Sequence, residues 1–359
     1  MTKEMNTMFR FIFATALTLM CSNSFAQEKK ASDAEEEKKE EKVSYRYSAG
    51  LNRSYVVYKS ATDGFFYVGS TVGHADSKDD QGQITVLAFE DFYDYKLKIF
   101  KNPVIISSEY TKTSLDAPKG LVTFDDYIIA TDLDALAIFK KVEKGLPKQV
   151  GRLKIKGAKN LHSILKINSD FYISDPDVNG IFKVTNLMDP EKREIIPLTR
   201  IPSPKGMIYD SAKDALLIVS SKVNKLYEYN LVDPKKSTTY TLAPEVPKDQ
   251  QKSHNGFIDL CMGNQKEIYL TNYEHNKIMI YFRDEDRPAT IKEPMKYAKV
   301  FISDVRTPTS IIYDKTLNRI IFTEFYYSIV RFNKGLPPQL TDDIIKQGLD
   351  IDKKLDMKK

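Results

Sequence analysis

The amino-acid sequence predicts an all-β protein, a six-bladed β-propeller whose last blade is completed by an N-terminal strand at about residues 43–48. First, short apolar runs recur in pairs around a small polar loop, as in FYISDPDVNGIFKV at 171–184. Second, the pairs recur with a period of roughly 40–50 residues, which is typical of one four-stranded blade per repeat. Third, the chain has 21 Tyr, 19 Phe and no Trp, and such aromatic content favours strands.

The number of blades follows from the second apolar run of each pair. These runs end near Phe89, Phe139, Val184, Tyr229, Phe282 and Phe332. The successive spacings are 50, 45, 45, 53 and 50 residues. A single blade cannot bury both of its faces, so repeats of this kind form a core by stacking on their neighbours. Six copies therefore indicate six blades around one axis.

Each repeat divides into strands that alternate apolar and polar residues between turn-forming residues. From the channel outward, the predicted strands of blades one to three are 54–60, 65–70, 83–89 and 95–100; 120–126, 127–132, 135–141 and 149–155; and 162–168, 171–175, 180–184 and 193–201. Those of blades four and five are 206–211, 215–221, 225–231 and 238–244; and 256–262, 267–272, 277–282 and 297–302. Blade six supplies only 310–315, 319–324 and 328–333.

The two ends of the repeat region predict how the ring closes. Blade six lacks a fourth strand before the prolines at 337 and 338, and VSYRYS at 43–48 is an alternating strand that belongs to no blade. Pairing this strand with blade six would remove the open edges that otherwise invite aggregation. An open array or a seventh blade is the alternative, but no seventh repeat is present.

The remaining segments predict export. Basic residues precede the apolar run FIFATALTLM, which is too short to span a membrane, and Ser24-Phe25-Ala26 fits a signal-peptidase site. We expect a signal peptide at 1–26, a charged disordered spacer at 27–42, the propeller at 43–335 and a tail with a short helix at 336–359. The mature protein would be periplasmic or secreted. Lipidation at Cys21 is the less favoured alternative, and otherwise Cys261 would remain as a lone thiol.

Charge excludes some functions. The chain has 54 basic and 49 acidic residues, and its lysines are scattered rather than gathered into a stripe with interleaved aromatics. We therefore expect no nucleic-acid partner, and no membrane span. A monomer is expected.

The predicted topology places the candidate site at one face. Loops that lead into the innermost strands share a face with loops between the second and third strands, and such loops commonly bind ligands. All four histidines map to these loops: His74, His162, His254 and His275. Other candidates are Lys119 and Lys205 beside the innermost strands, and the polar residues that end the second strands, Asp132, Asp175, Asn272 and Glu324. Each of these polar residues could equally cap a turn.

Three phrases carry a family resemblance: KGLVTFDDYIIATDLDALAIFK at 119–140, KGMIYDSAKDALLIVSSKVNKLYEYN at 205–230, and NGFIDLCMGNQKEIYLTNYEHNKIMIYF at 255–282. They resemble the senescence marker protein/gluconolactonase-like and NHL-repeat class of six-bladed propellers. Lactonases of that class hold one divalent ion at the channel mouth, with oxygen ligands just before the glycine that opens an inner strand. The matching positions in this chain are Lys119, Lys205 and Asn255, with Leu161 and Thr309 as looser matches, and of these only Asn255 keeps a suitable oxygen. The resemblance therefore implies that the lactonase metal site is not kept.

The sequence favours a binding module over an enzyme. Lysines in place of metal ligands, together with histidines, would form a rim for an anionic small molecule or an acidic protein or peptide. No cofactor is expected under this interpretation. The alternative is a metal-dependent hydrolase acting on lactone or ester bonds. It would hold Ca²⁺ or another divalent ion through Asn255 together with Asp132, Asp175, Asn272 or Glu324.

Overall fold

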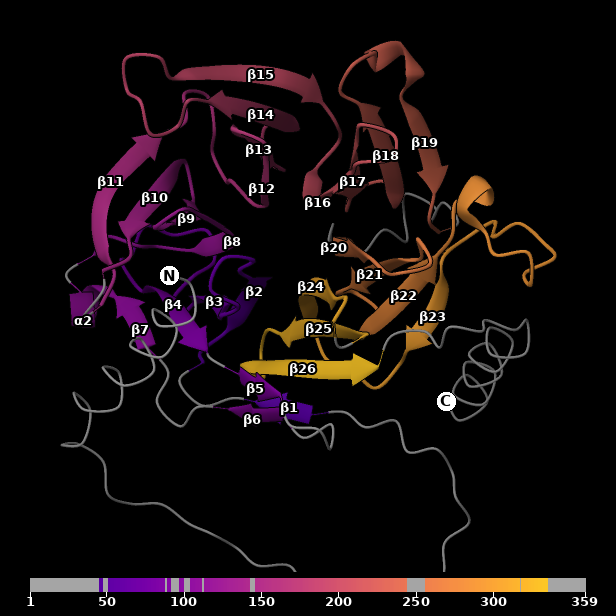
Figure 1. The fold of residues 1–359 in the computed structure, drawn as a ribbon, viewed down its shortest axis with the longest axis horizontal. Coiled ribbons are helices and arrows are strands. Elements are labelled where there is room, and N and C mark those ends of the chain that lie inside the picture. Colours follow the sequence, from indigo (N-terminus) through magenta and orange to yellow (C-terminus); the bar gives the residue numbers. More distant parts are fainter. Residues whose placement is uncertain are drawn as a thin grey trace, which may run out of the picture.

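The computed structural model is a ring of six four-stranded antiparallel sheets. It describes residues 45–47, 51–87, 89–91, 97–99, 104–111, 113–142, 146–243, 256–316 and 318–334. Innermost strands of successive blades contact one another around the ring, and the last contacts the first, as Figure 1 shows. The predicted six-bladed propeller is therefore confirmed. The predicted signal peptide, the spacer and the tail lie outside the described residues.

Each blade consists of four strands, which follow one another from the channel outward. Blades one to three are β2 (Ser54–Lys59), β3 (Phe66–Thr71), β4 (Gly82–Leu87) and β7 (Val104–Ser107); β8 (Pro118–Phe124), β9 (Tyr127–Asp132), β10 (Ala135–Lys140) and β11 (Lys148–Lys154); and β12 (Ile164–Ile167), β13 (Asp170–Asp175), β14 (Gly180–Thr185) and β15 (Glu194–Arg200). Blades four to six are β16 (Pro204–Asp210), β17 (Ala215–Ser220), β18 (Lys225–Asn230) and β19 (Thr238–Thr241); β20 (Phe257–Met262), β21 (Ile268–Asn272), β22 (Lys277–Tyr281) and β23 (Lys299–Ile302); and β24 (Pro308–Asp314), β25 (Arg319–Glu324), β26 (Ile329–Lys334) and β1 (Tyr45–Tyr47).

Strand β1 closes the ring. It pairs with β26 in antiparallel register, with Arg46 opposite Arg331, and lies beside β26 in Figure 1. The outermost strand of blade six thus comes from the N-terminal end of the domain, as the sequence predicts. The closure joins the two ends of the repeat region by backbone pairing, so no blade is left with only three strands.

The prediction for the outermost strand of blade one is wrong. The sequence predicts that residues 95–100 pair with the third strand, but β7 takes that place and pairs with β4. Strand β6 (Leu97–Ile99) instead pairs with β5 (Phe89–Asp91) in a separate two-stranded hairpin. The insertion alternates apolar and polar residues as a blade strand does, so periodicity alone could not distinguish them. The short helix α2 (Ser108–Thr111) follows β7.

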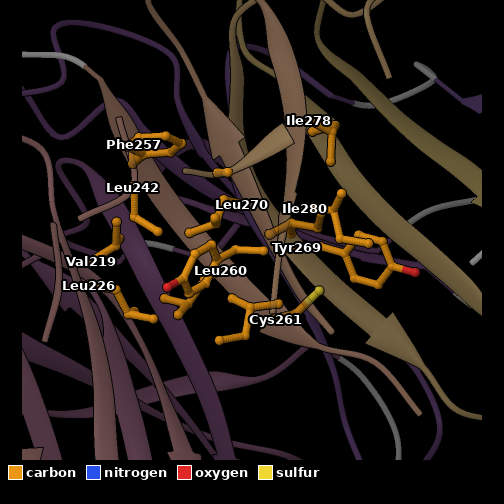
Figure 2. Close-up of a cluster of buried hydrophobic side chains, with 14 of the residues drawn as sticks. Val219, Leu226, Leu242, Phe257, Leu260, Cys261, Tyr269, Leu270, Ile278 and Ile280 are labelled. Atoms are coloured by element: carbon orange, nitrogen blue, oxygen red, sulfur yellow. The ribbon is translucent and has the colours of Figure 1, made fainter. Parts of the chain in front are cut away.

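The core lies between the faces of neighbouring blades. Second strands are buried along their whole length in blades one, four, five and six, whereas the outermost strand β11 alternates between exposed and half-buried residues. Figure 2 shows the cluster between blades four and five, where Leu226 of β18 faces the same apolar layer as Leu260 and Tyr269. This packing fixes the inner strands, and with them the channel.

Among the described residues, the remaining helices are two short 3₁₀ turns, η1 (Pro234–Lys236) and η2 (Asp284–Asp286). None of the helices in this part of the chain is long and apolar enough to cross a membrane.

Candidate functional site

A pocket of about 550 Å³ opens at the mouth of the channel and is lined by all six blades. The lining residues of each blade lie at or just before the start of its inner strand, or in the loop between its second and third strands. One lining residue from each blade, in order, is Tyr55, Lys119, His162, Lys205, Tyr273 and Phe325. The two kinds of loop therefore meet at one face, as the strand order predicts.

Irregular pairing at the start of the inner strands directs side chains toward this pocket. In blades one, two, four, five and six, the register between the inner strand and its neighbour shifts within the first few residues. A bulge of this kind re-aims the side chain that it contains. Five pocket-lining residues fall within these shifts: Tyr55, Lys119, Lys205, Ile258 and Thr309.

The glycine after each inner-strand lysine permits the close packing of neighbouring blades. A Cβ atom at Gly120 would lie 2.4 Å from the carbonyl oxygen of His162, and one at Gly206 would lie 2.2 Å from an Asp259 carboxylate oxygen. Both distances are too short for any side chain without movement of the neighbour. The Lys-Gly pairs thus set how near the inner strands approach beneath the pocket.

Lys119 is buried and held in a polar cluster. Its Nζ lies 2.7 Å from Asp76 Oδ1 and 2.5 Å from Asn160 Oδ1, and the Asn160 amide also donates to Asp76. Burial lowers the pKa of Lys119, while the Asp76 carboxylate opposes that shift. The Asp76 side chain is 74% exposed. The counter-charge of Lys119 is therefore a carboxylate at the rim that remains open to solvent.

Lys205 has no comparable support. Its backbone oxygen accepts a hydrogen bond of 2.6 Å from Ser174 Oγ, but among the described residues its ammonium has no hydrogen-bond or ion-pair partner. Burial and the positive charge of Lys119 lower the pKa of Lys205 to about 8, although the carboxylates of Asp76 and Asp177 oppose that shift. Lys222, which is exposed, lines the same pocket. The pocket thus contains a lysine that is charged at neutral pH at an energetic cost.

His162 contacts Tyr55 and lies within the electrostatic reach of both Lys119 and Lys205. The Tyr55 hydroxyl and His162 Nε2 are 2.9 Å apart, and the two rings meet edge to face. His162 is buried, and burial together with the charges of Lys205 and Lys119 holds its pKa well below the usual range. The imidazole is therefore neutral near pH 7. Its buried Nδ1 has no hydrogen-bond partner among the described residues.

A second cavity of about 260 Å³ continues from the mouth along the inner strands and shares Tyr55, Lys119 and His162 with the pocket. Asp259 lines it and accepts hydrogen bonds from Ser310 Oγ and the Ile311 amide. Burial nevertheless raises the pKa of Asp259 to about 6. A carboxyl group at mid-channel therefore titrates close to neutral pH.

Two of the predicted acidic residues anchor loops and lie outside the pocket lining. Asp132 accepts hydrogen bonds from the Asp116 and Ala117 amides and pairs with Arg152. Asp175 accepts from several backbone amides, including that of Asn160 at 3.0 Å. Asp175 therefore acts indirectly, because it positions the loop that carries Asn160 into the pocket.

Asn272 and Glu324 behave in the same way. Asn272 Oδ1 accepts from the His275 amide at 3.0 Å, and Glu324 receives a hydrogen bond of 2.9 Å from Arg331 Nη1. Both side chains are buried, and neither lines the pocket. Asp175 and Asn272 thus cap the turns that follow their strands, whereas Asp132 holds the loop at Asp116 and Ala117, and Glu324 pairs with Arg331.

Of the predicted histidines, only His162 lines the described pocket. His74 and His275 are exposed on loops of the same face, and His254 and Asn255 lie outside the described residues. Within the described ranges there is no group of three or more His, Cys, Asp or Glu side chains arranged to hold a metal ion. The prediction that Asn255 would bind any metal thus stays a prediction.

The sequence did not single out several lining residues, among them Tyr55, Asp76, Asn160 and Tyr326. Tyr55 is part of a plain alternating strand, and only the bulge turns it toward the mouth. The other three lie in polar or aromatic loops without a motif. The sequence around these residues does not indicate that they line the pocket, because this depends on which loops of different blades come together at the channel mouth.

Comparisons with known proteins identify the fold. No family model matches the chain, and no curated protein matches it. Among solved structures, a putative 6-phosphogluconolactonase from Bacteroides fragilis shares 14% identity over 77% of this chain and 78% of its own, with a TM-score of 0.53. One from Bacteroides uniformis shares 13% identity over 77% and 80%, with a TM-score of 0.52. A streptogramin B lyase shares 14% identity over 81% and 96%, with a TM-score of 0.50.

These similarities show that the chain has a β-propeller fold in common with lactonase-like and lyase propellers. At such low identity they do not extend to the chemistry of the channel mouth. The residues of the pocket must support any functional argument.

Proposed function

We propose that the chain is a binding protein for a small anionic molecule, held in the channel-mouth pocket. The observation that carries this proposal is the pair of lysines, Lys119 and Lys205, in one pocket where the described residues supply an ion-pair partner to Lys119 alone. Two nearby positive charges repel each other, and burial removes the water that would screen them. A bound carboxylate or phosphate would relieve both costs.

The surroundings of the lysines support the same interpretation. The Asn160 amide lies in the pocket, where one of its N–H groups donates to Asp76 and the second can donate a hydrogen bond to an oxyanion. Asp76 already supplies a carboxylate to Lys119 from the exposed rim, and this pairing supports the binding of a ligand oxyanion at the same position. A ligand oxyanion could take the place of Asp76 or bind beside it at Lys205.

Calorimetric titration tests the proposal. Because two of the structural neighbours are described as putative 6-phosphogluconolactonases, the first probes are 6-phosphogluconate, gluconate and inorganic phosphate. We expect Lys119→Met and Lys205→Met each to weaken binding about tenfold, since a hydrogen bond to a charged group contributes roughly 1.5 kcal/mol. Methionine keeps the aliphatic stem while removing the charge.

Lys235→Met is the matched control, because Lys235 is exposed in η1 at the opposite end of the blades. Absence of binding by all three anions, or equal affinity in the wild type and both pocket variants, would contradict the proposal. The metal-dependent hydrolase is tested in the same samples. A saturable rise in melting temperature with Ca²⁺, Zn²⁺ or Mn²⁺, reversed by EDTA, would favour the hydrolase instead.

A further inference from the structure

The pocket has two chemically different halves. Blades two to four contribute amide and charged side chains, namely Lys119, Asn160, Lys205 and Lys222, together with the carboxylate of Asp177. Blades five, six and one contribute a run of rings, namely Tyr273, Phe325, Tyr326 and Tyr55, and blade one adds the Asp76 carboxylate that pairs with Lys119. We call the first set the cationic arc and the second the aromatic arc. The two arcs meet at blades one and two, where the Lys119 ammonium lies 5.9 Å from the centre of the Tyr55 ring.

Tyr326 is held in place and yet uncovered. Its amide donates to Thr307 Oγ1 at 3.3 Å, and the Phe325 amide donates to the Thr307 carbonyl at 3.1 Å. The Tyr326 ring meets Phe325 edge to face with centroids 5.0 Å apart, and Phe325 meets Tyr55 in the same way at 5.8 Å. The Tyr326 side chain is nevertheless 63% exposed. A ring fixed at its base with an open face can stack on a ligand without a large ordering cost.

The size of the pocket indicates that the anion is part of a larger molecule. Ligand sites commonly measure roughly 300–1,000 Å³, and this pocket, at about 550 Å³, lies within that range. A simple oxyanion beside the lysines would leave the aromatic arc unoccupied. Tyrosine rings offer a flat apolar surface that favours planar groups.

We infer that the ligand carries a planar ring next to its anionic group, with the ring stacked on Tyr326 and the anion bound at Lys119 and Lys205. This inference rests on the proposed function, because it assigns the remainder of the ligand at the same site.

The test compares methyl phosphate, cyclohexyl phosphate and phenyl phosphate, which share the anion and differ in the attached group. We expect phenyl phosphate to bind wild-type protein about three- to tenfold more tightly than methyl phosphate, with cyclohexyl phosphate between them. In Tyr326→Ala the advantage of the phenyl group disappears while methyl phosphate binds as before. Tyr326→Phe retains the advantage. Tyr327→Ala is the matched control, because Tyr327 lies next in the chain and packs on Arg306 outside the pocket lining.

The outcomes separate the two proposals. If all three phosphates bind wild-type protein equally, or if the phenyl advantage persists in Tyr326→Ala, the inference about the ring is overturned and the anion site stands. If none of the phosphates binds, the anion site itself is overturned. Tyr326 is mostly exposed, so its replacement by alanine is not expected to unfold the protein.

Discussion

Lys205 combines a stability cost with the binding role proposed for it. Its folded pKa of about 8 lies below the ordinary value of 10.5, so the native state releases this proton more readily than the unfolded chain does. Below pH 8 the native state therefore bears the full cost of the charge. Between pH 8 and 10.5 the folded state loses the Lys205 proton before the unfolded state does. The cost of the charge therefore declines, and the free energy of unfolding of the wild type rises with pH in this interval.

We therefore predict that Lys205→Met raises the free energy of unfolding at pH 7 by about 1–2 kcal/mol, after allowance for partial solvent exposure. The gain should shrink as the pH rises from 8 toward 10. Urea unfolding of the two proteins at pH 7 and pH 9.5 measures both effects. A variant less stable than the wild type at pH 7 would show that the charge is favourably paired in the native state.

Sequence patterns identified the pocket residues that lie at fixed places in the repeat. Lys119, His162 and Lys205 adjoin the starts of inner strands, and the strand count alone places them at the mouth. The roles of Asp132 and Asp175, which end second strands, could not be predicted in that way. An aspartate at such a position can either accept hydrogen bonds from a loop or bind a ligand. The amides that point at Asp132 and Asp175 are a property of the folded loops.

At the scale of elements, a buried arginine joins blades four and five at the end opposite the pocket. Arg283 follows β22 and is fully buried. Its guanidinium lies 2.6 Å from Asp210 of β16 and 2.6 Å from Glu228 of β18, and it also pairs with Asp286. Arg283 thus links blade five to blade four by ion pairs at the end of the channel that has no proposed ligand site.

We predict that Arg283→Met lowers the free energy of unfolding by about 3–5 kcal/mol, because it removes the cation that pairs with the buried Asp210 and one of the cations that pair with Glu228 and Asp286. Anion affinity at the mouth should stay unchanged. Lys213→Met serves as the control, since Lys213 contacts Glu228 from a partly exposed position and should cost about 1 kcal/mol or less. A loss below 1 kcal/mol for Arg283→Met would show that water or rearrangement compensates these carboxylates.

At the scale of the whole molecule, the sequence predicts the number of blades and the closing strand, but not which segment completes blade one. The period of the repeats indicates six blades, and the surplus strand at 43–48 predicts the closure, which β1 and β26 confirm. Blade one shows the limit of this reasoning. The β5–β6 hairpin has the periodicity of a blade strand, and only long-range pairing of β7 with β4 decides which segment completes the sheet.

Closure by β1 predicts the effect of truncation. A chain that starts at Leu51 lacks β1, so we expect it to lose about 3 kcal/mol of unfolding free energy through lost backbone pairing, and to aggregate through the exposed edge of β26. A chain that starts at Val43 keeps β1 and should match the full-length protein. Urea unfolding measures the stability of the full-length protein and of the chains that start at Val43 and Leu51, and light scattering measures their aggregation. Equal stability of the Leu51 chain would mean that closure contributes nothing.

The central claim is that a charged Lys205 attracts an anion to the channel mouth. The most direct test is calorimetric titration with sulfate, which stays a dianion from pH 7 to 9.5, into wild-type protein and Lys205→Met. We predict that sulfate binds the wild type at pH 7 and loses affinity above about pH 8, as Lys205 releases its proton. Lys205→Met should bind more weakly and show no such change. Equal affinities in the two proteins, or no binding to the wild type, would contradict the claim.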